Sequence, residues 1–415
     1  MFKKNFFYSN DINISKNVGI EIKSFDEFND LEKNLVQLAN INCENIEAWT
    51  ALGTNAQINY YTHGIFRYFG KFPAPISTQL IREYSSENDR IMDLMSGSGT
   101  TGLEALLNDR ECILNDVNPL CCLLAKVKTH YIPKQKIINC VSYIKSNYKP
   151  LTYEQYPFIP EGINYEHWFY PETVNSLRGL KFLIDQIKDI ALKNYMTIIF
   201  LSIIRNVSKA TTQQGRLFLD IESAQLDTLE IFCNKAIKYS SKLPKLKSNI
   251  KILNKDIRQI NFSNYRKKAS LIILHPPYFN SYKYSSINSL ELSWFGYNHA
   301  DIRKSEIKEF FKVGKPDKVE TYIDDMKDSI IHAIKGLDEN GHLAVMIGDT
   351  RIKNEYIPVT KMLIDKLSEN QQLELIKFIL RVPKYTEASW VSSQRRNREN
   401  VGIPLCDFIL IFKKI

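Results

Sequence analysis

The apolar residues of this chain follow two different rhythms. Over residues 60–130 and 250–415, short apolar runs end at glycine, aspartate or proline and alternate with segments of helical periodicity. Over residues 131–249, glycines are few and apolar residues recur at helical spacing, most clearly at 173–194 and 196–208. The first rhythm predicts strands that alternate with helices, and the second predicts a mostly helical insertion.

The α/β rhythm allows individual elements to be placed. We expect strands at residues 90–95, 111–115, 249–253, 271–274, 341–348, 373–382 and 407–413, and helices at 25–39, 102–108, 321–337 and 358–367. The last two strands are expected to pair at a sheet edge. Residues 1–59 are polar and are interpreted as an N-terminal extension. Strands and helices that alternate on both sides of an insertion predict one doubly wound, Rossmann-like α/β sheet.

Composition narrows the class of protein. The 415 residues are 44% hydrophobic and 24% charged, as in ordinary soluble domains, and the formal net charge of +9 favours polyanionic partners. No apolar run reaches the roughly 18 residues of a membrane span, and the basic, aromatic start is a poor signal peptide. The seven cysteines form no CxxC or Cys/His ligand spacing, so we expect reduced thiols, no metal and a cytoplasmic protein.

A glycine-rich turn follows the expected strand at 90–95. It contains Gly97-x-Gly99-x-x-Gly102, a spacing that matches dinucleotide-binding loops. A dehydrogenase is nevertheless disfavoured, because the carboxylate of Asp93 would repel a pyrophosphate. The same carboxylate would attract an ammonium group, such as that of the methionine part of S-adenosylmethionine.

Two further aspartates follow later strands. Asp116 lies about 20 residues past the glycines, where an acidic residue hydrogen-bonds ribose hydroxyls. Asp256 lies just past the strand at 249–253 and is a candidate for the adenine amine. Each aspartate alone could be a helix cap or a turn residue. Three of them at successive strand ends favour a nucleoside cofactor.

The segment Leu271-Ile-Ile-Leu-His275-Pro276-Pro277-Tyr278 carries the second candidate site. Its apolar run predicts a buried strand, and the two prolines stop that strand in a stiff, extended corner. Open α/β sheets bind ligands at the carboxyl ends of their strands. Taken alone, the segment is also explained by a buried strand followed by an ordinary Pro-Pro turn.

Together these segments resemble the amino-methyltransferase family of DNA methyltransferases. The glycine motif is similar to Asp93 and 97–101, and the family's catalytic motif, an Asp, Asn, Ser or Thr before Pro-Pro-Tyr, is matched at 275–278. An additional cofactor segment, which precedes the glycine loop in one permutation group, is similar to 70–77, and the late strands are similar to 337–349 and 407–413. The sequence after the corner, 279–296, resembles members that modify cytosine N4.

The resemblance implies a seven-stranded methyltransferase sheet, S-adenosylmethionine as cofactor and methyl transfer to an exocyclic base amine. The implied cofactor-binding residues are Lys71, Phe72, Pro73, Asp93, Met95, Ser96, Gly97, Ser98, Gly99, Thr100, Thr101, Asp116 and Asp256. The implied catalytic residues are His275, Pro276, Pro277 and Tyr278. The residue at 275 and the Pro276 carbonyl would accept the hydrogens of the amine, and Tyr278 would stack on the flipped base.

The chain departs from the family pattern in two places. Position 275 is histidine, and the long insertion lies between Asp116 and Asp256, earlier than many members place their target-recognition region. A neutral imidazole can accept one hydrogen bond, but a protonated one cannot. We therefore expect an active enzyme whose rate falls below about pH 6.5, the ordinary pKa of histidine. An imidazole without any role is the alternative.

Contacts with DNA are predicted in two places. Tyr282 and Tyr284, beside the corner, are expected to line the nucleotide pocket. Arg395, Arg396 and Arg398 form a basic loop suited to phosphates, although an exposed loop without a ligand explains them equally well.

Double-stranded DNA and a cognate restriction endonuclease are the expected partners, and the sequence indicates no oligomeric state. The function favoured by the sequence is cytosine-N4 methylation of DNA. Adenine-N6 methylation, RNA guanine-N2 methylation and a non-catalytic DNA-binding relic are the alternatives.

Overall fold

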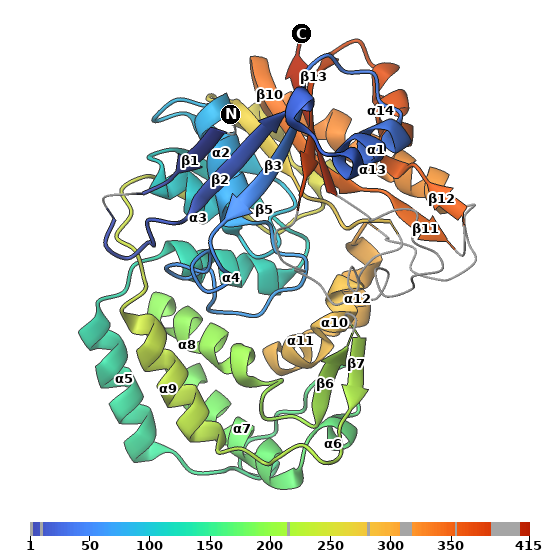
Figure 1. The fold of residues 1–415 in the computed structure, drawn as a ribbon. Coiled ribbons are helices and arrows are strands. Elements are labelled where there is room, and N and C mark those ends of the chain that lie inside the picture. The colour runs from blue at the N-terminus through green and yellow to red at the C-terminus, as the bar shows by residue number, and fades with distance from the viewer. Residues whose placement is uncertain are drawn as a thin grey trace.

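The computed structural model describes residues 3–8, 11–213, 216–279, 283–307, 318–352, 355–382 and 407–415. Its centre is a ten-stranded mixed sheet in the order β1-β2-β3-β13-β14-β10-β9-β4-β5-β8 (Figure 1). The strands of this sheet are β1 Lys3–Phe6, β2 Gly19–Ser24, β3 Ile46–Leu52, β4 Arg90–Asp93, β5 Glu111–Asn115, β8 Ile250–Leu253, β9 Ala269–Leu274, β10 Leu337–Gly348, β13 Leu373–Arg381 and β14 Asp407–Lys414. Two separate hairpins pair β6 Ala210–Gln213 with β7 Arg216–Leu219 and β11 Thr350–Ile352 with β12 Glu355–Ile357.

The helices fall into those that cover the sheet and those that form a separate layer. The α-helices are α1 Asp30–Ala39, α2 Ala74–Tyr84, α3 Thr100–Leu107, α4 Pro119–Thr129, α5 Lys134–Asn147, α6 Tyr165–Trp168, α7 Pro171–Asp185, α8 Ile190–Ile203, α9 Thr228–Ser240, α10 Tyr284–Ile287, α11 Ser289–Phe295, α12 His299–Ser305, α13 Val319–Ala333 and α14 Val359–Ser368. Short 3₁₀ turns are η1 Phe25–Glu27, η2 Ile257–Gln259, η3 Phe262–Asn264 and η5 Ile334–Gly336. No helix in the described ranges is both long and apolar enough to cross a membrane.

The sheet is mostly parallel and has a core on each face. β8, β5, β4, β9 and β10 run parallel, and β14 lies antiparallel between β10 and β13. Side chains of β9 alternate, so Leu271 packs with α2, α3 and α4 while Ile272 packs with α1, α13 and α14. The expectation of a doubly wound α/β sheet is thus confirmed.

The first 52 residues differ from the expectation of a polar extension with one helix. Three strands, β1 to β3, extend the main sheet, and β3 pairs in parallel with β13. The strands predicted at 373–382 and 407–413 do pair with each other, as expected. They lie in the interior of the sheet, however, so the prediction that they form its edge is wrong. The alternation of apolar and polar residues from Ile20 to Lys23 was the available signal for β2.

Residues 131–249 form a helical layer below the sheet in Figure 1, with α4 between the two. The predicted helices at 173–194 and 196–208 are shifted, because Asp189 accepts a hydrogen bond from the Leu192 amide (2.8 Å) and starts α8 after a gap of four residues that follows α7. The fully buried Trp294 of α11 packs within this layer. The β6–β7 hairpin in this layer was not expected.

Candidate active site

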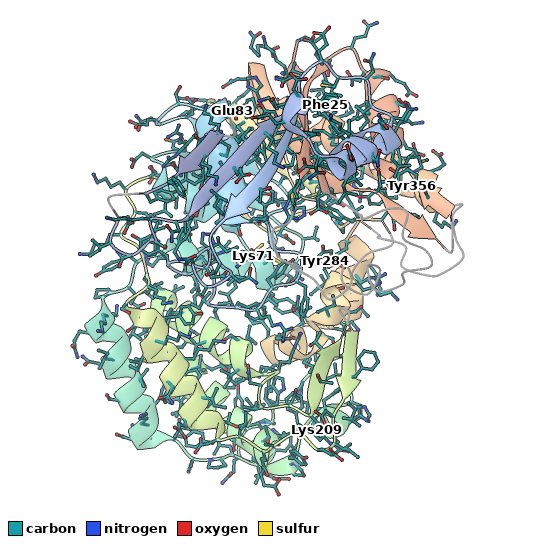
Figure 2. All side chains as sticks on the ribbon, viewed as in Figure 1. Phe25, Lys71, Glu83, Lys209, Tyr284 and Tyr356 are labelled. Carbon is teal, nitrogen blue, oxygen red and sulfur yellow. The ribbon has the colours of Figure 1, made fainter. Side chains whose placement is uncertain are left out.

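One cavity lies at the carboxyl ends of β4, β5, β8 and β9 and brings together most of the predicted site residues. The predicted residues that line it are Lys71, Phe72, Asp93, Met95, Ser96, Gly97, Ser98, Asp116, Asp256, His275, Pro277 and Tyr284. Figure 2 labels Lys71 and Tyr284 in the region between the sheet and the helical layer, and both residues line this cavity. The cofactor candidates and the catalytic corner therefore share one space.

The strand ends that form this cavity are held together by Asn115. Its Nδ2 donates to the carbonyls of Leu94 (3.1 Å) and Lys255 (3.0 Å), and its Oδ1 accepts from the Lys255 amide (3.1 Å). These bonds join the ends of β4, β5 and β8. Asn115 also lines the cavity, although the sequence analysis did not single it out.

The glycine loop is shaped by two left-handed residues. Gly97 has φ +47°, and its amide donates to Asp116 Oδ2 (2.8 Å). A Cβ at Gly97 would lie 3.3 Å from the ring of Tyr68, which itself lines the cavity. Gly99 has φ +71° and would place a Cβ 2.9 Å from Ala125 of α4. The loop therefore requires glycine for its backbone conformation and for close packing on both sides.

Not all predicted loop residues line the cavity. Gly99 caps α3, and Thr100 and Thr101 form its first turn, which makes the predicted start of that helix at 102 two residues late. Pro73 caps α2. None of these four lines the cavity. Their positions indicate that they support the loop from behind.

Asp93 is deeply buried, whereas Asp116 is partly open to the cavity. Burial raises the pKa of Asp93 to about 7 and that of Asp116 to about 6. Asp256 differs, because hydrogen bonds from Arg258 lower its pKa and Arg258 Nη2 lies 2.7 Å from its Oδ2. Asp93 and Asp116 are thus poised to ionise when a cation or hydrogen-bond donors enter, whereas Asp256 already has a cationic partner.

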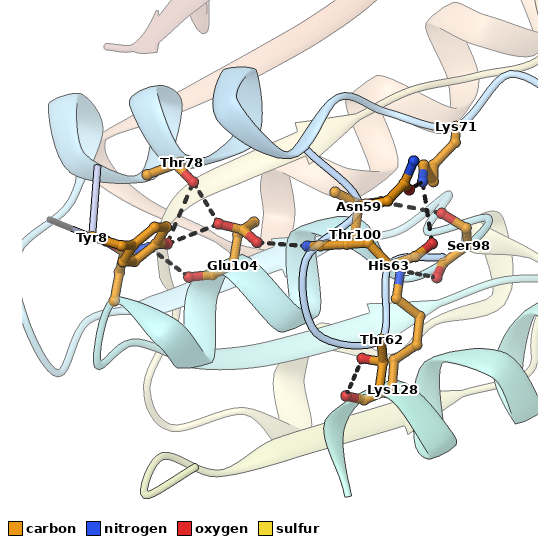
Figure 3. A network of polar contacts seen from close by, with 11 residues as sticks. Tyr8, Asn59, Thr62, His63, Lys71, Thr78, Ser98, Thr100, Glu104 and Lys128 are labelled. Carbon is orange, nitrogen blue, oxygen red and sulfur yellow. Dashed lines mark hydrogen bonds and ion pairs between the residues drawn. The ribbon is translucent and has the colours of Figure 1, made fainter. Parts of the chain in front are cut away.

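A buried polar network supports the loop and reaches the cavity wall at Ser98 and Lys71 (Figure 3). Lys128 Nζ donates to the carbonyl of Ser98 (2.9 Å), and His63 Nε2 lies 2.7 Å from Glu104 Oε1. Burial, followed by the charge of Lys128, lowers the pKa of His63 to about 4. Lys71 Nζ donates to the His63 carbonyl (3.1 Å). The network therefore fixes the ammonium group of Lys71 at the cavity wall.

The Pro-Pro corner is held rigidly. The Tyr322 hydroxyl of α13 donates to the Pro277 carbonyl (2.9 Å), and Pro276 is buried. The ring of His275 lies 5.4 Å from that of Phe72, and its Nε2 is 3.2 Å from the hydroxyl of Tyr278. These contacts fix the imidazole beside the cavity.

His275 remains neutral at physiological pH. Although the ring is partly open to the cavity, burial, followed by the charge of Arg381, lowers its pKa to about 3. The premise that His275 keeps the ordinary histidine pKa of about 6.5 is therefore wrong, and no loss of rate below about pH 6.5 is expected from this residue. A neutral ring retains one acceptor nitrogen, so its capacity to accept does not change across the physiological range.

Tyr278 does not line the cavity. Its ring packs against Gly348, where a Cβ would lie 3.2 Å from two of its carbons. Pro276 is also absent from the cavity wall. Tyr282, Arg395, Arg396 and Arg398 lie outside the described residues.

The fold and the cavity together define a class of site. An α/β sheet carries carboxylates and a glycine loop at its strand ends, with a rigid Pro-Pro corner in the same cavity, an arrangement suited to a nucleoside cofactor.

More particularly, residues 2–127 match the N6_N4_Mtase family, described as DNA methylase. This match relates the chain to the N6/N4 DNA methylase family and confirms the resemblance found in the sequence; it covers the glycine loop and Asp116 and ends before the corner.

The chain is also similar to one curated methyltransferase and, more distantly, to solved structures. The Type II methyltransferase M.MvaI from Kocuria varians is 25% identical over 174 residues, which cover 39% of this chain and 38% of that protein. Among solved structures, TrmN from Thermus thermophilus is 10% identical over 83% of this chain and 50% of that one, with a TM-score of 0.33. An rRNA methylase from Streptococcus thermophilus is 9% identical over 84% and 99%, with a TM-score of 0.29.

Proposed function

We propose that this protein is an S-adenosylmethionine-dependent DNA methyltransferase that modifies an exocyclic base amine. The observation that carries the proposal is the single cavity that joins Asp93 and Asp116 to His275 and Pro277. A methyl donor held at the first pair would lie beside an amine held at the second. Similarity to the DNA methylase family supports DNA as the substrate.

The residues at the strand ends fit the cofactor. Asp93 offers a buried carboxylate for an ammonium group, the partly exposed carboxylate of Asp116 suits ribose hydroxyls, and Gly97 leaves room for close approach of a ligand. Lys71 provides a positive charge at the same wall. When bound, S-adenosylmethionine supplies an electrophilic methyl group. Asp256 is the candidate for the adenine amine, which it would bind either beside its contact with Arg258 or in exchange for it.

The corner fits the amine of a flipped base. The Pro276 carbonyl, to which no described residue donates a hydrogen bond, and the neutral ring of His275 are the proposed acceptors. Acceptors on the amine hydrogens favour a pyramidal nitrogen whose lone pair is available for attack. Tyr284 lines the cavity and is proposed to contact the base. Tyr278, packed on Gly348, is proposed to support the corner and to offer its remaining surface to the base.

Cytosine N4 is the proposed target, because the sequence after the corner resembles cytosine-N4 members. Adenine N6 is the second candidate, since position 275 carries a residue typical of neither group. The helical layer at 131–249 is proposed as the target-recognition region, with 60–130 and 250–415 as the catalytic domain. The matched relative is named a type II methyltransferase, so a cognate restriction endonuclease is part of the proposal.

The decisive experiment is expression in a host that lacks DNA methylation, followed by mapping of modified bases in its DNA. N4-methylcytosine at one sequence is the expected result. N6-methyladenine would support the second candidate. Unmodified DNA, with purified protein that methylates an RNA or no nucleic acid at all, would overturn the proposal. A variant with Asp93→Asn provides the matched inactive control.

A further inference from the structure

Two arginines share one aromatic ring beside the cavity. The guanidinium carbon of Arg67 lies 5.0 Å from the ring centre of Phe69, and that of Arg205 lies 5.7 Å from the same centre. Arg67 precedes α2 and Arg205 follows α8, so the sheet half and the helical layer each contribute one. We call Arg67, Phe69 and Arg205 the guanidinium patch.

The patch is anchored on one side and exposed on the other. Arg205 Nη2 donates to the Ile287 carbonyl (2.7 Å) and lies 2.9 Å from Glu291 Oε1, and its Nη1 donates to Thr212 of the β6–β7 hairpin (3.0 Å). Arg67 is exposed, and no described residue forms an ion pair with it. Two positive charges therefore lie near a single buried carboxylate, and one of them faces solvent.

The patch adjoins the cavity from both sides. Tyr68 and Gly70, the sequence neighbours of Phe69, line the cavity. Ile287, which accepts from Arg205, ends the short helix that begins at the cavity residue Tyr284. Arg67 is thus next in sequence to the cavity residue Tyr68, and it is not itself among the residues that line the cavity.

We propose that the guanidinium patch binds a backbone phosphate of the DNA strand whose base enters the cavity. The inference rests on the proposed function. A base that enters the cavity brings its own phosphates to the rim, and a planar guanidinium matches the geometry of a phosphate. Arg67 makes the contact, the ring of Phe69 orients its guanidinium, and Arg205 also packs against that ring.

The test measures duplex DNA binding by fluorescence anisotropy in 50–200 mM salt, with the cofactor product S-adenosylhomocysteine present. Each phosphate contact contributes about 0.9 to the slope of log affinity against log salt. Arg67→Gln should therefore lower the slope by about 0.9 and weaken binding roughly five- to tenfold near 0.1 M salt, equally for different sequences. Arg67→Lys should keep most of the slope, because it keeps the charge.

The matched control is Lys335→Gln, which removes an exposed positive charge at the opposite end of the sheet, just before β10 begins. It should leave the slope unchanged. If Arg67→Gln behaves like Lys335→Gln while the wild-type protein binds and methylates DNA, the inference fails and the proposed function stands. If the wild-type protein shows no salt-dependent DNA binding, or prefers RNA, the proposed function fails first.

Discussion

The two walls of the cavity respond to burial in opposite ways. On the wall formed by β4 and β5, burial raises the pKa of Asp93 to about 7 and that of Asp116 to about 6. On the wall formed by the corner after β9, burial lowers the pKa of His275 to about 3. Burial favours the uncharged form in both cases, because a charged group loses hydration there.

The difference lies in what each wall receives. A ligand with an ammonium group restores the charge on Asp93, so binding at that wall should depend on pH near neutrality. The amine of a nucleobase is neutral and needs an acceptor without a proton, which His275 provides at any physiological pH. The comparison predicts that pH controls the cofactor wall and not the catalytic wall.

The largest expected effect comes from removing the charge on the cofactor wall. Asp93→Asn should weaken binding of S-adenosylhomocysteine roughly 10- to 150-fold, because a hydrogen bond to a charged group is worth about 1.5–3 kcal/mol. Isothermal titration calorimetry measures this directly. Asp328→Asn, an exposed carboxylate of α13, is the matched control and should bind normally. Equal affinities for the two variants would remove Asp93 from the cofactor site.

The next effect is the pH dependence of the wild-type protein. Affinity for S-adenosylhomocysteine should fall more than tenfold from pH 8 to pH 5.5, because Asp93 and then Asp116 take up protons through their pKa values of about 7 and about 6. Asp93→Asn should show a much shallower dependence. A flat wild-type profile would mean that Asp93 remains charged in the free protein.

The free energy of unfolding should change with pH in the opposite direction to the cofactor affinity, because it should be higher at low pH. The pKa of Asp93 is higher in the folded chain than its ordinary value of 3.8, so its contribution is fully present below about pH 4 and is lost as pH rises through about 7. Without cofactor, the free energy of unfolding in urea should therefore decrease by a few kcal/mol over this range from this group. Asp93→Asn should flatten the decrease, and an unchanged curve would contradict the raised pKa.

The cofactor wall was largely predictable from sequence, and the reason is local. Asp93 ends a short apolar strand, Gly97 and Asp116 follow such strands, and parallel strands end at one edge of a sheet, so their convergence follows from the pattern alone. The position of His275 follows from the same argument. Its pKa could not be predicted, because it depends on Phe72 and Arg381, which are about 200 and 100 residues away along the chain.

The rest of the site depends on packing that no local pattern encodes. Arg67 and Arg205 meet on Phe69 only because α8 returns toward the segment before α2. In the sequence, Asn115 is an ordinary residue at the end of a strand, and only the fold brings the carbonyl of Lys255 within reach of its side chain. β1 to β3 were missed because charged residues interrupt their apolar positions, although β2 does alternate.

A smaller effect is expected on the catalytic wall. His275→Ala removes one neutral hydrogen-bond acceptor, worth about 0.5–1.5 kcal/mol, so the single-turnover rate should fall about two- to thirteenfold. With cofactor and DNA saturating, the wild-type rate should show no fall between pH 8 and pH 5.5 that depends on His275, because its pKa is about 3. A fall near pH 6.5 that His275→Asn abolishes would show that the imidazole titrates there.

The smallest effects are expected from adding one methyl group at each wall, by Gly348→Ala at the corner and by Gly97→Ala at the glycine loop. Gly348→Ala would place a Cβ 3.2 Å from the ring of Tyr278, so the ring must shift by a few tenths of an ångström. We expect a fall of a few fold in the single-turnover rate with unchanged cofactor affinity, since positioning at the corner is affected and the carboxylates are not. Gly97→Ala is the counterpart, because its Cβ would meet Tyr68 at 3.3 Å from a left-handed backbone, and it should lower cofactor affinity instead. If both variants change the same parameter, the two walls do not act separately.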